Sequence, residues 1–393
     1  MAAINPSDLY LVDELFSEEE RAVRDAVMKW VRTRYLPLIE EHYEGGTFPL
    51  EVVPELGELG VFGATLPEEY GCAGASATAY GLINQAMEYG DSGLRSFVSV
   101  QSGLVMYPIF RYGSENQRQR WLPLLATGER VGCFGLTEPN HGSNPGGMET
   151  RARPVDGGYL LNGAKAWITN GCLADVAVVW AKVGDGGSKS VRGFLVEKGM
   201  AGFATAEYKK KLSLRASVTS ELFFKDVFVP EENVLPGVQG LRGPLSCLNQ
   251  ARYGIAWGAV GAAQFCYEAA LRYSLERTQF DRPIGGFQLQ QLKLSEMATA
   301  LTRMQLIAWR LGQLKGENRA TPVMISLAKR DNVFQARKIA RTAREMHGAM
   351  GIMLESQVMR HANNLESVYT YEGTHDVHHL ILGEAVTGLA AYS

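Results

Sequence analysis

Cysteine is scarce in this 393-residue sequence, and its placement excludes two kinds of scaffold. The cysteines are odd in number, scattered along the chain and without a CxxC pair, which argues against a disulfide framework and against a zinc ribbon. They are Cys72, Cys133, Cys172, Cys247 and Cys266. A reducing compartment is therefore expected.

Runs of one charge are also missing. The 39 Lys and Arg residues nearly balance the 42 Asp and Glu residues, giving a formal net charge of -3, and no basic block or basic helix face is present. A protein that binds nucleic acid needs such a face to neutralise phosphates. No nucleic-acid partner is expected.

Targeting and membrane segments are lacking as well. The first twenty residues are acidic early and have neither the apolar region of a signal peptide nor the Arg-rich face of a transit peptide. The most apolar stretch, residues 253–271, reaches a charge at Glu268 and is too short and too rich in Gly and Ala to cross a membrane. We expect Gly254 and Gly258 to let two helices approach closely. The expected location is cytoplasmic, with no membrane partner.

Periodicity divides the chain into three parts. Up to about residue 130, apolar positions recur every three or four residues, as in helices. Short β-branched or aromatic runs with period-two alternation follow, and long helical patterns return over about 246–276, 287–316, 321–350 and from Thr374. We therefore predict an α+β multidomain protein. Its parts are an N-terminal α-helical domain (1–130), a middle antiparallel β-barrel domain (131–236) and a C-terminal four-helix bundle (237–393).

This order excludes one common way of binding a nucleotide. Helices, then strands, then helices give no alternating βαβ pattern, and no GxGxxG fingerprint follows a strand. A doubly wound nucleotide-binding fold is not expected. Any nucleotide cofactor must bind in another way.

The stretch "YEGTHDVHH", residues 371–379, gathers histidines and carboxylates as a metal site would. On one helix face it would offer four ligands. They would be Glu372, His375, Asp376 and His379. Gly373 follows the glutamate, however, and Thr374 is a good N-cap, so we expect the helix to begin after Glu372. The face then loses its best ligand, and no metal is predicted. The histidines are interpreted as polar groups that satisfy backbone amides at the helix start.

The glutamate of this stretch needs another explanation. Glu372 lies between Tyr371 and Gly373, where a carboxylate is partly desolvated. Desolvation raises the pKa of a carboxyl toward the range that suits a general base. A single base without a metal suits proton abstraction next to a carbonyl.

Several strings resemble the acyl-CoA dehydrogenase family. "YEGTHDVHHLILG" is similar to the family's C-terminal signature, and its "TYEGTHD" form resembles the glutaryl-CoA branch. "VGCFGLTEPNHGSNPGGMETRA", "LNGAKAWITNG", "CLNQARYGIAWG" and "RTQFDRPIGGFQLQQLKLSEM" follow the family order. The resemblance implies FAD as cofactor, the fold already inferred, and Glu372 as the catalytic base.

The resemblance also implies which residues bind FAD. Phe134, Leu136, Thr137, Gly142 and Ser143 would line the flavin ring, with Trp167 stacked on it and Thr169 near its N5 atom. Arg277, Gln279, Phe280 and Gln288 would contact the FAD of a neighbouring subunit, which implies a homo-oligomer, most simply a tetramer. Gly348 and Thr374 complete the cofactor set. Without the motifs, Trp167 would be a hydrophobic strand residue and Arg277 a helix-end charge.

The substrate residues follow in the same way. Arg95 matches an arginine that pairs with the distal carboxylate of a glutaryl chain, with Ser96 and Ser99 as helpers; otherwise it would be a solvated helix residue. Glu88 and Tyr371 match the branch members that decarboxylate. Ser143, Asn249, Arg252 and Gly373 complete the expected substrate contacts. Helix packing is the alternative for Asn249.

The implied activity is FAD-dependent α,β-dehydrogenation of an acyl-CoA. The expected substrate is glutaryl-CoA from lysine or tryptophan degradation, which would be converted to crotonyl-CoA and CO2, with electrons passed to an electron-transfer flavoprotein. Two alternatives stay open. One is another short-chain or dicarboxylic acyl-CoA, and the other is a glutaryl-CoA dehydrogenase that does not decarboxylate.

Four positions depart from the family pattern. Asn144 stands where aspartate is usual, and Asp281 follows Phe280 where glycine is common. Ala349 and Met350 replace part of a glycine-rich loop that approaches the dinucleotide, so a change in FAD affinity is expected there.

Overall fold

The computed structural model describes residues 5–184 and 186–391 of the chain. Its N-terminal third is helical, as predicted. The helices are α1 (Glu18–Trp30), α2 (Leu36–Gly45), α3 (Val53–Glu58), α4 (Ala77–Gly90), α5 (Ser92–Ser99), α6 (Tyr107–Tyr112) and α7 (Glu115–Ala126). Local signals set several starts, since Ser17 forms a capping box with Glu20 and Ser114 forms one with Gln117.

Asp91 separates α4 from α5 and orients the second helix. Its backbone is extended, which ends α4, and its carboxylate accepts a hydrogen bond from Gly93 N at 2.6 Å as the N-cap of α5. Arg360 and Asn364 also donate to this buried carboxylate. The turn that aims α5 is therefore held from a distant part of the chain.

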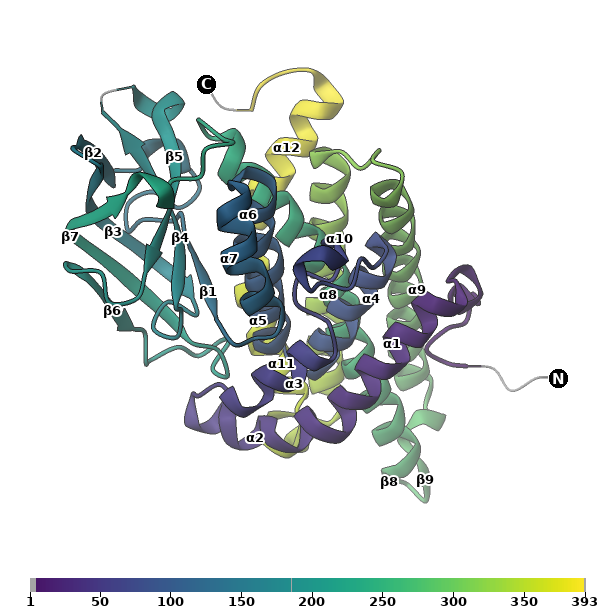
Figure 1. The fold of residues 1–393 in the computed structure, drawn as a ribbon. Coiled ribbons are helices and arrows are strands. Elements are labelled where there is room, and N and C mark those ends of the chain that lie inside the picture. The colour runs from purple at the N-terminus through teal and green to yellow at the C-terminus, as the bar shows by residue number, and fades with distance from the viewer. Residues whose placement is uncertain (1–4, 185, 392–393) are drawn as a thin grey trace.

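The middle domain is a seven-stranded sheet. Its strands are β1 (Gly132–Gly135), β2 (Arg151–Val155), β3 (Gly158–Thr169), β4 (Val176–Val183), β5 (Val191–Glu197), β6 (Phe203–Glu207) and β7 (Thr219–Pro230). The hydrogen-bonded order is β1-β4-β2-β3-β7-β6, and β5 pairs with β4. Figure 1 shows this sheet to one side of the helices.

The prediction of an antiparallel sheet needs a correction. Most neighbouring pairs are antiparallel, but β1 and β2 both run parallel to β4. Parallel pairing needs a long crossover connection, and the chain between β1 and β4 contains the whole β2–β3 hairpin. Alternation of apolar residues sets which face is buried and carries no information on strand direction.

The C-terminal part is helical, and three predicted helices lie within four residues of their expected bounds. Its elements are α8 (Arg242–Glu276), α9 (Gln288–Gly316), α10 (Pro322–Met346), α11 (Val358–Thr370) and α12 (His375–Thr387), with a small hairpin of β8 (Thr278–Gln279) and β9 (Arg282–Pro283) between α8 and α9. The sequence did not separate α11. That helix begins after Gln357, which has a left-handed backbone and makes no side-chain cap hydrogen bond.

The unusual Asp281 has a conformational explanation. It forms the two-residue turn of the β8–β9 hairpin with Phe280, and both residues have positive φ, 59° for Asp281 and 52° for Phe280. Such a turn favours Gly, Asn or Asp at these positions. The aspartate therefore suits the turn where the family commonly has glycine.

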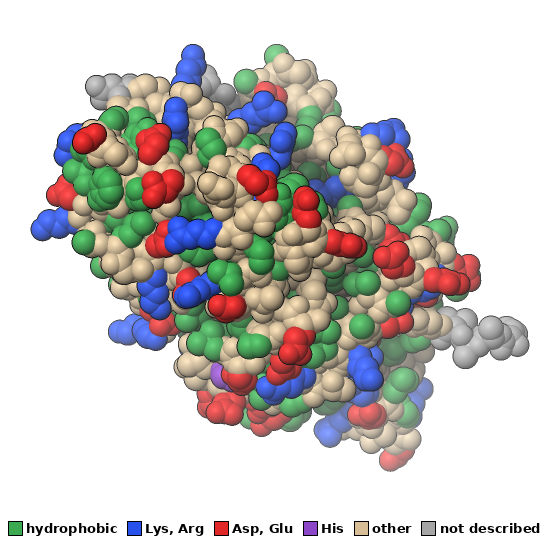
Figure 2. Space-filling view, in the orientation of Figure 1, with side chains coloured by type: hydrophobic (Ala, Val, Ile, Leu, Met, Phe, Trp, Pro, Cys, Tyr) green, Lys and Arg blue, Asp and Glu red, His purple; other side chains and the backbone are tan. Residues whose placement is uncertain are grey.

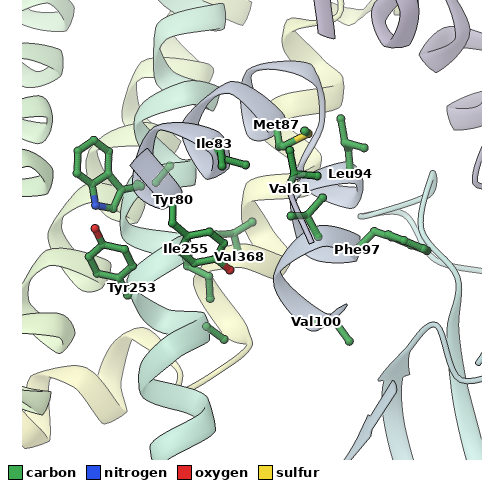
Figure 3. Close-up of a cluster of buried hydrophobic side chains, with 14 of the residues drawn as sticks. Val61, Tyr80, Ile83, Met87, Leu94, Phe97, Val100, Tyr253, Ile255 and Val368 are labelled. Carbon is green, nitrogen blue, oxygen red and sulfur yellow. The ribbon is translucent and has the colours of Figure 1, made fainter. Parts of the chain in front are cut away.

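One core joins the N-terminal and C-terminal helices. Figure 3 shows part of it, where Ile83 of α4, Leu94 of α5, Ile255 of α8 and Val368 of α11 lie in one cluster. Close approach of α4 and α8 depends on glycine, because a Cβ on Gly258 would lie 2.0 Å from Glu88 Oε2. The predicted role of Gly254 and Gly258 in helix contact is confirmed.

The surface drawn in Figure 2 mixes basic and acidic side chains over the whole face. Within residues 5–184 and 186–391, no helix has both the length and the apolar character that crossing a membrane requires.

Candidate active site

The loop between α11 and α12 presents Glu372. Thr374 caps α12 by accepting a hydrogen bond from Val377 N at 3.2 Å, so the helix begins after the glutamate, as predicted. Glu372 and Gly373 both have left-handed backbones, with φ of 54° and 88°. A Cβ on Gly373 would lie 3.0 Å from His378 Nε2, so glycine suits both the conformation and the space.

Two buried cations hold the backbone of this loop. Lys329 of α10 donates to the carbonyl oxygens of Tyr371 at 3.0 Å and Gly373 at 2.9 Å. Arg252 of α8 donates to the carbonyl of Glu372 at 2.8 Å. The predicted Arg252 is thus next to the predicted base. Lys329 was not predicted, because one lysine among many charges on an amphipathic helix gives no signal.

The Glu372 carboxylate is poised to titrate near neutral pH. Its Oε2 atom is buried without a hydrogen-bond partner in the described part of the chain. Burial raises the pKa of Glu372 to about 7, against the charges of Arg95, Arg252 and Lys329, which act to lower it. The raised pKa expected from the sequence is confirmed.

Arg95 lies in the core beside this loop, and the alternative of a solvated arginine is wrong. Its side chain is 1 % exposed, and its Nε donates to Glu88 Oε2 at 2.6 Å. Its Nη2 contacts the Tyr371 hydroxyl, which also lies 3.3 Å from Ser96 Oγ. The structure therefore brings together four predicted residues around Arg95: Glu88, Ser96, Tyr371 and, through the chain, Glu372.

The charges in this cluster are matched. Burial acts to lower the pKa of Arg95, but the charge of Glu88 and the Tyr371 hydroxyl outweigh it and the pKa is raised. Glu88 is also anchored by Ser92, whose Oγ donates to its Oε1 at 2.8 Å. Arg95 is thus a fixed and permanently charged group. The Ser99 hydroxyl, one helical turn away, is buried and has no hydrogen-bond partner among the described residues.

A second group of predicted residues forms a rim on the β-domain. The rim consists of Phe134, Leu136, Thr137, Gly142, Ser143, Trp167 and Thr169. The Thr137 carbonyl accepts from Ala166 N at 2.9 Å, which places the end of β1 beside the end of β3. Trp167 of β3 has a positive φ of 61°, is 62 % exposed, and stacks on Tyr208 with 4.5 Å between ring centroids. Trp167 is thus a strand residue, as in the alternative for it, but it is mostly exposed.

The other rim residues differ in how far they are exposed to solvent. The side chains of Phe134 and Leu136 are buried, Thr137 and Thr169 are half-buried, and Gly142 and Ser143 are exposed. Behind the rim, Lys165 donates to the Leu136 carbonyl at 3.0 Å and to Glu138 at 2.8 Å. This buried ion pair fixes the end of β1 against β3.

The rim fits the cofactor that the sequence motifs imply. An exposed indole offers a flat face for a planar ring, and the hydroxyls of Thr137, Ser143 and Thr169 offer donors and acceptors for a polar ring edge. Apart from its stacking on Tyr208, the indole is mostly exposed. Its exposed surface suits stacking on a flat ligand.

Four predicted cofactor residues lie far from this rim. Arg277, Gln279, Phe280 and Gln288 are exposed around the β8–β9 hairpin, which Figure 1 shows on the side of the molecule away from the β-domain. Phe280 is 86 % exposed. Arg277 ends α8, so the helix-end alternative for it stays open.

The altered loop after α10 keeps one required glycine. A Cβ on Gly351 would lie 2.1 Å from the Arg344 carbonyl oxygen, so no side chain fits there. Gly348 is exposed with a φ of 57°, and the new side chains of Ala349 and Met350 are also exposed. The departures from the family pattern thus add side chains to the surface of the loop.

Two further predictions concern α8 and α12. Asn249 precedes Arg252 by one helical turn, and its Oδ1 is buried without a partner in the described residues.

The histidines do not satisfy backbone amides, which corrects that interpretation: His375 stacks on Tyr369 at 4.4 Å and its Nε2 lies 3.1 Å from that of His379. Across residues 5–184 and 186–391, no group of three or more His, Cys, Asp or Glu side chains could hold a metal.

Comparison with known proteins gives consistent matches along the chain. The family models for acyl-CoA dehydrogenases match in order: the N-terminal domain over residues 17–129, the middle domain over 133–227 and the C-terminal domain over 238–387. An acyl-CoA dehydrogenase of Bacillus subtilis (strain 168) is 33% identical over 374 residues, which are 95% of this chain and 99% of that protein.

Solved structures are also similar. A glutaryl-CoA dehydrogenase from Mycobacterium smegmatis in complex with FADH2 superposes with a TM-score of 0.97 at 50% identity, over 100% of both chains. A glutaryl-coenzyme A dehydrogenase in complex with glutaryl-CoA gives a TM-score of 0.92 at 33% identity, over 95% of this chain and 96% of that one.

Proposed function

We propose that this chain, which belongs to the acyl-CoA dehydrogenase family, oxidises glutaryl-CoA and decarboxylates it to crotonyl-CoA and CO2. The observation that carries the proposal is a buried arginine, Arg95, joined through Tyr371 to the loop that presents Glu372. A carboxylate-binding cation and a base are thereby fixed relative to each other. They suit a short dicarboxylic chain activated at its other end.

FAD is the cofactor, and it supplies the acceptor for the hydride that leaves the β-carbon. Trp167, Thr137, Ser143 and Thr169 would hold its ring on the rim of the β-domain. Thr374 and the backbone of residues 134–137 belong to the same proposed set. Lys165 supports them from behind the sheet by fixing the Leu136 carbonyl.

Glu372 would remove the α-proton of the thioester. Its pKa of about 7 makes the carboxylate a stronger base than an exposed glutamate, while a large fraction is still ionised at neutral pH. The α-proton of a thioester is only weakly acidic. The thioester oxygen therefore needs hydrogen bonds to stabilise the negative charge that develops on it. The backbone N–H of Glu372 would supply one. Arg252 lies against Glu372 and Gly373, and Asn249 is one helical turn before Arg252.

Arg95 would select the substrate. A buried guanidinium can form two parallel hydrogen bonds to a carboxylate, whereas an alkyl chain end would leave it without that partner. Tyr371 and Ser96 already lie on the side of Arg95 that faces the loop, and Ser99 adds a free hydroxyl. A distal carboxylate would join or displace the Tyr371 hydroxyl at Arg95.

Decarboxylation would follow oxidation. The new double bond conjugates the γ-carbon with the thioester, so the bond to the distal carboxylate can break, releasing CO2 and leaving its electron pair on the acyl chain. Protonated Glu372 would return its proton to the γ-carbon and give crotonyl-CoA. Glu88 and Tyr371, which contact Arg95, are the residues whose resemblance favours this outcome.

The test is anaerobic mixing of the purified, FAD-loaded protein with glutaryl-CoA. Bleaching of the visible flavin band followed by crotonyl-CoA and CO2 is expected, and glutaconyl-CoA as the end product would replace the proposal with the non-decarboxylating alternative. Glu372→Gln should retain FAD and lose flavin reduction. An unimpaired rate in that variant would refute the assigned base.

The proposed role of Arg95 in substrate choice is tested with two acyl-CoA thioesters of equal chain length. Valeryl-CoA has the same chain length as glutaryl-CoA and lacks only the distal carboxylate. Arg95→Met should lower the rate with glutaryl-CoA much more than the rate with valeryl-CoA. Equal effects on both would favour the alternative of another short-chain or dicarboxylic acyl-CoA.

The same proposal includes partners and location. Arg277, Gln279, Phe280 and Gln288 are exposed and far from the rim of their own chain, which supports contact with the FAD of a neighbouring subunit in a homotetramer. Light scattering of the purified protein tests the oligomer. An electron-transfer flavoprotein as acceptor and a cytoplasmic location complete the proposal, and reduction of that flavoprotein by the substrate-reduced enzyme tests the partner.

A further inference from the structure

We infer that Lys329 is a positioning residue that fixes the peptide plane before Glu372 and the one after Gly373, and so aims the groups that activate the substrate. The inference rests on the proposed role of Glu372 as the base. It concerns a lysine on α10, far along the chain from the family's active-site strings, which touches only the backbone of the loop.

The geometry of the loop carries the inference. The carbonyls of Tyr371, Glu372 and Gly373 are successive, and each accepts a hydrogen bond from a buried cation. Lys329 Nζ bridges the outer two, and Arg252 holds the middle one. A single ammonium group between the two carbonyls that bracket Glu372 and Gly373 leaves this pair of residues little freedom to rotate about its φ and ψ angles.

The hydrogen bond from Lys329 to the Tyr371 carbonyl sets the direction of the Glu372 N–H, which lies in the same peptide plane. In a trans peptide the C=O and the next N–H point in opposite directions. Because Lys329 holds the Tyr371 carbonyl, the N–H of Glu372 points away from Lys329. This N–H is the proposed donor to the thioester oxygen. Its direction is therefore set from the far side of the loop.

The conformation needs such support. Glu372 has a φ of 54°, in a region that residues other than glycine rarely adopt, and local side-chain preferences would move it away. Lys329 is 1 % exposed, and none of the ion pairs found in the described chain involves it. A lysine buried without a carboxylate partner is rare, so its use of two backbone carbonyls accounts for its presence.

The charge of Lys329 also acts on the base. The charged or titratable groups that interact with Glu372 are Arg95 of α5, Arg252 and Cys247 of α8, Lys329 of α10, Tyr80 of α4 and the adjacent Tyr371, with His378 of α12 beside Gly373. Burial, with the charges of Lys329 and Arg252, lowers the pKa of His378 to about 3, so this ring is neutral. Burial also lowers the pKa of Lys329 to about 7, while the charge of Glu372 acts to keep the lysine protonated. Protonated Lys329 lowers the pKa of Glu372, so removing the lysine would raise that pKa.

The test measures proton abstraction alone. The CoA thioester of thiodiglycolic acid is a glutaryl-CoA analogue with sulfur at the β-position, so it has an exchangeable α-proton but no hydride to give. Exchange of this proton in D2O is followed by NMR with the FAD-loaded enzyme across pH. Flavin content, melting temperature and the dissociation constant of the analogue are measured in parallel.

The variants are Lys329→Met, Lys329→Arg and the control Lys338→Met, an exposed lysine on the same helix. Lys329→Met should lower the plateau exchange rate by about 10- to 100-fold, as expected for misplaced reacting groups, and shift its rising pH limb upward. Binding of the analogue should change much less. Lys329→Arg keeps the charge and two N–H donors and should restore most of the rate and the pH limb.

Several outcomes would overturn the inference. One is a Lys329→Met plateau and pH limb equal to those of Lys338→Met. Another is a Lys329→Arg variant no faster than Lys329→Met, which would assign the loss to damaged packing. If Lys329→Met does not retain FAD, the Lys329→Arg variant alone tests the inference. An exchange rate that rises at the same pH as in wild type supports it. An exchange rate as low as that of Glu372→Gln refutes it. Equal exchange by wild type and Glu372→Gln would instead refute the proposed base.

Discussion

Gly258 offers a way to disturb Arg95, the arginine that we propose selects the substrate, without replacing it. A Cβ at this position would lie 2.0 Å from Glu88 Oε2 and 3.1 Å from Arg95 Nε, so Gly258→Ala places a methyl group against the buried ion pair. Ordinary contact needs about 3.5 Å, so the Glu88 carboxylate must retreat by roughly 1.5 Å. If it moves directly away from Arg95, the 2.6 Å hydrogen bond lengthens to about 4.1 Å, a distance at which it is no longer a hydrogen bond.

The free energies can be estimated from these displacements. Overpacking a core by one methyl group costs about 1–3 kcal/mol, and losing a hydrogen bond to a charged group adds about 1.5–3 kcal/mol. Replacing glycine by alanine inside a helix returns roughly 1 kcal/mol. We expect Gly258→Ala to lower the free energy of unfolding by about 1.5 to 5 kcal/mol.

The assay combines stability with substrate choice. Denaturant unfolding of the FAD-loaded variant gives the free energy, and stopped-flow flavin reduction compares glutaryl-CoA with valeryl-CoA. The control is Gly383→Ala in α12, where a Cβ would meet nothing within 4 Å. It should be neutral or slightly stabilising. A Gly258→Ala variant as stable as this control, with an unchanged preference for glutaryl-CoA, would refute the reasoning.

Three further predictions follow from buried groups. Flavin reduction should rise with pH through about 7, because Glu372 acts only when deprotonated and its pKa is raised to that value; a rate independent of pH between 5 and 9 would contradict this. Lys165→Met should lower the free energy of unfolding by about 3–5 kcal/mol in denaturant titrations, since Glu138 is left as an unpaired buried charge; a loss below about 1 kcal/mol would contradict it. Gly351→Ala should lower the melting temperature and the FAD content, because its Cβ would lie 2.1 Å from the Arg344 carbonyl; a wild-type melting curve would contradict it.

Features encoded locally were predictable from the sequence. The long helices of the C-terminal part have apolar residues at three- and four-residue spacing, so α8, α9 and α10 were placed within a few residues of their bounds. The start of α12 was predictable because Thr374 and Gly373 are adjacent signals in the chain. The same signals placed Glu372 on a loop. The helix α11 lacks a polar N-cap hydrogen bond and was missed.

Features that depend on distant parts of the chain were not predictable. Lys329 binds carbonyls that lie 42 and 44 residues further along, and a backbone carbonyl has no residue type to recognise. Arg95 was identified only through a family motif, since a helical arginine is ordinarily solvated. Parallel pairing of β1 with β4 depends on the path of the chain between them. Strand alternation also gave no reason to expect an exposed Trp167.

The arrangement of charges around the loop explains why the base can be buried and still function. Arg95 is paired with Glu88, and its charge still acts more strongly than that of Arg252 or Lys329 to lower the pKa of Glu372. Arg252 and Lys329 donate to backbone carbonyls instead of carboxylates, and their charges lower this pKa as well. Burial alone would make the glutamate hard to ionise, and these three cations counteract that effect without forming an ion pair that would fix the carboxylate. A direct salt bridge would lower the pKa further and occupy the oxygen that must reach the substrate. Holding the backbone and not the side chain therefore keeps Glu372 both oriented and free to take a proton.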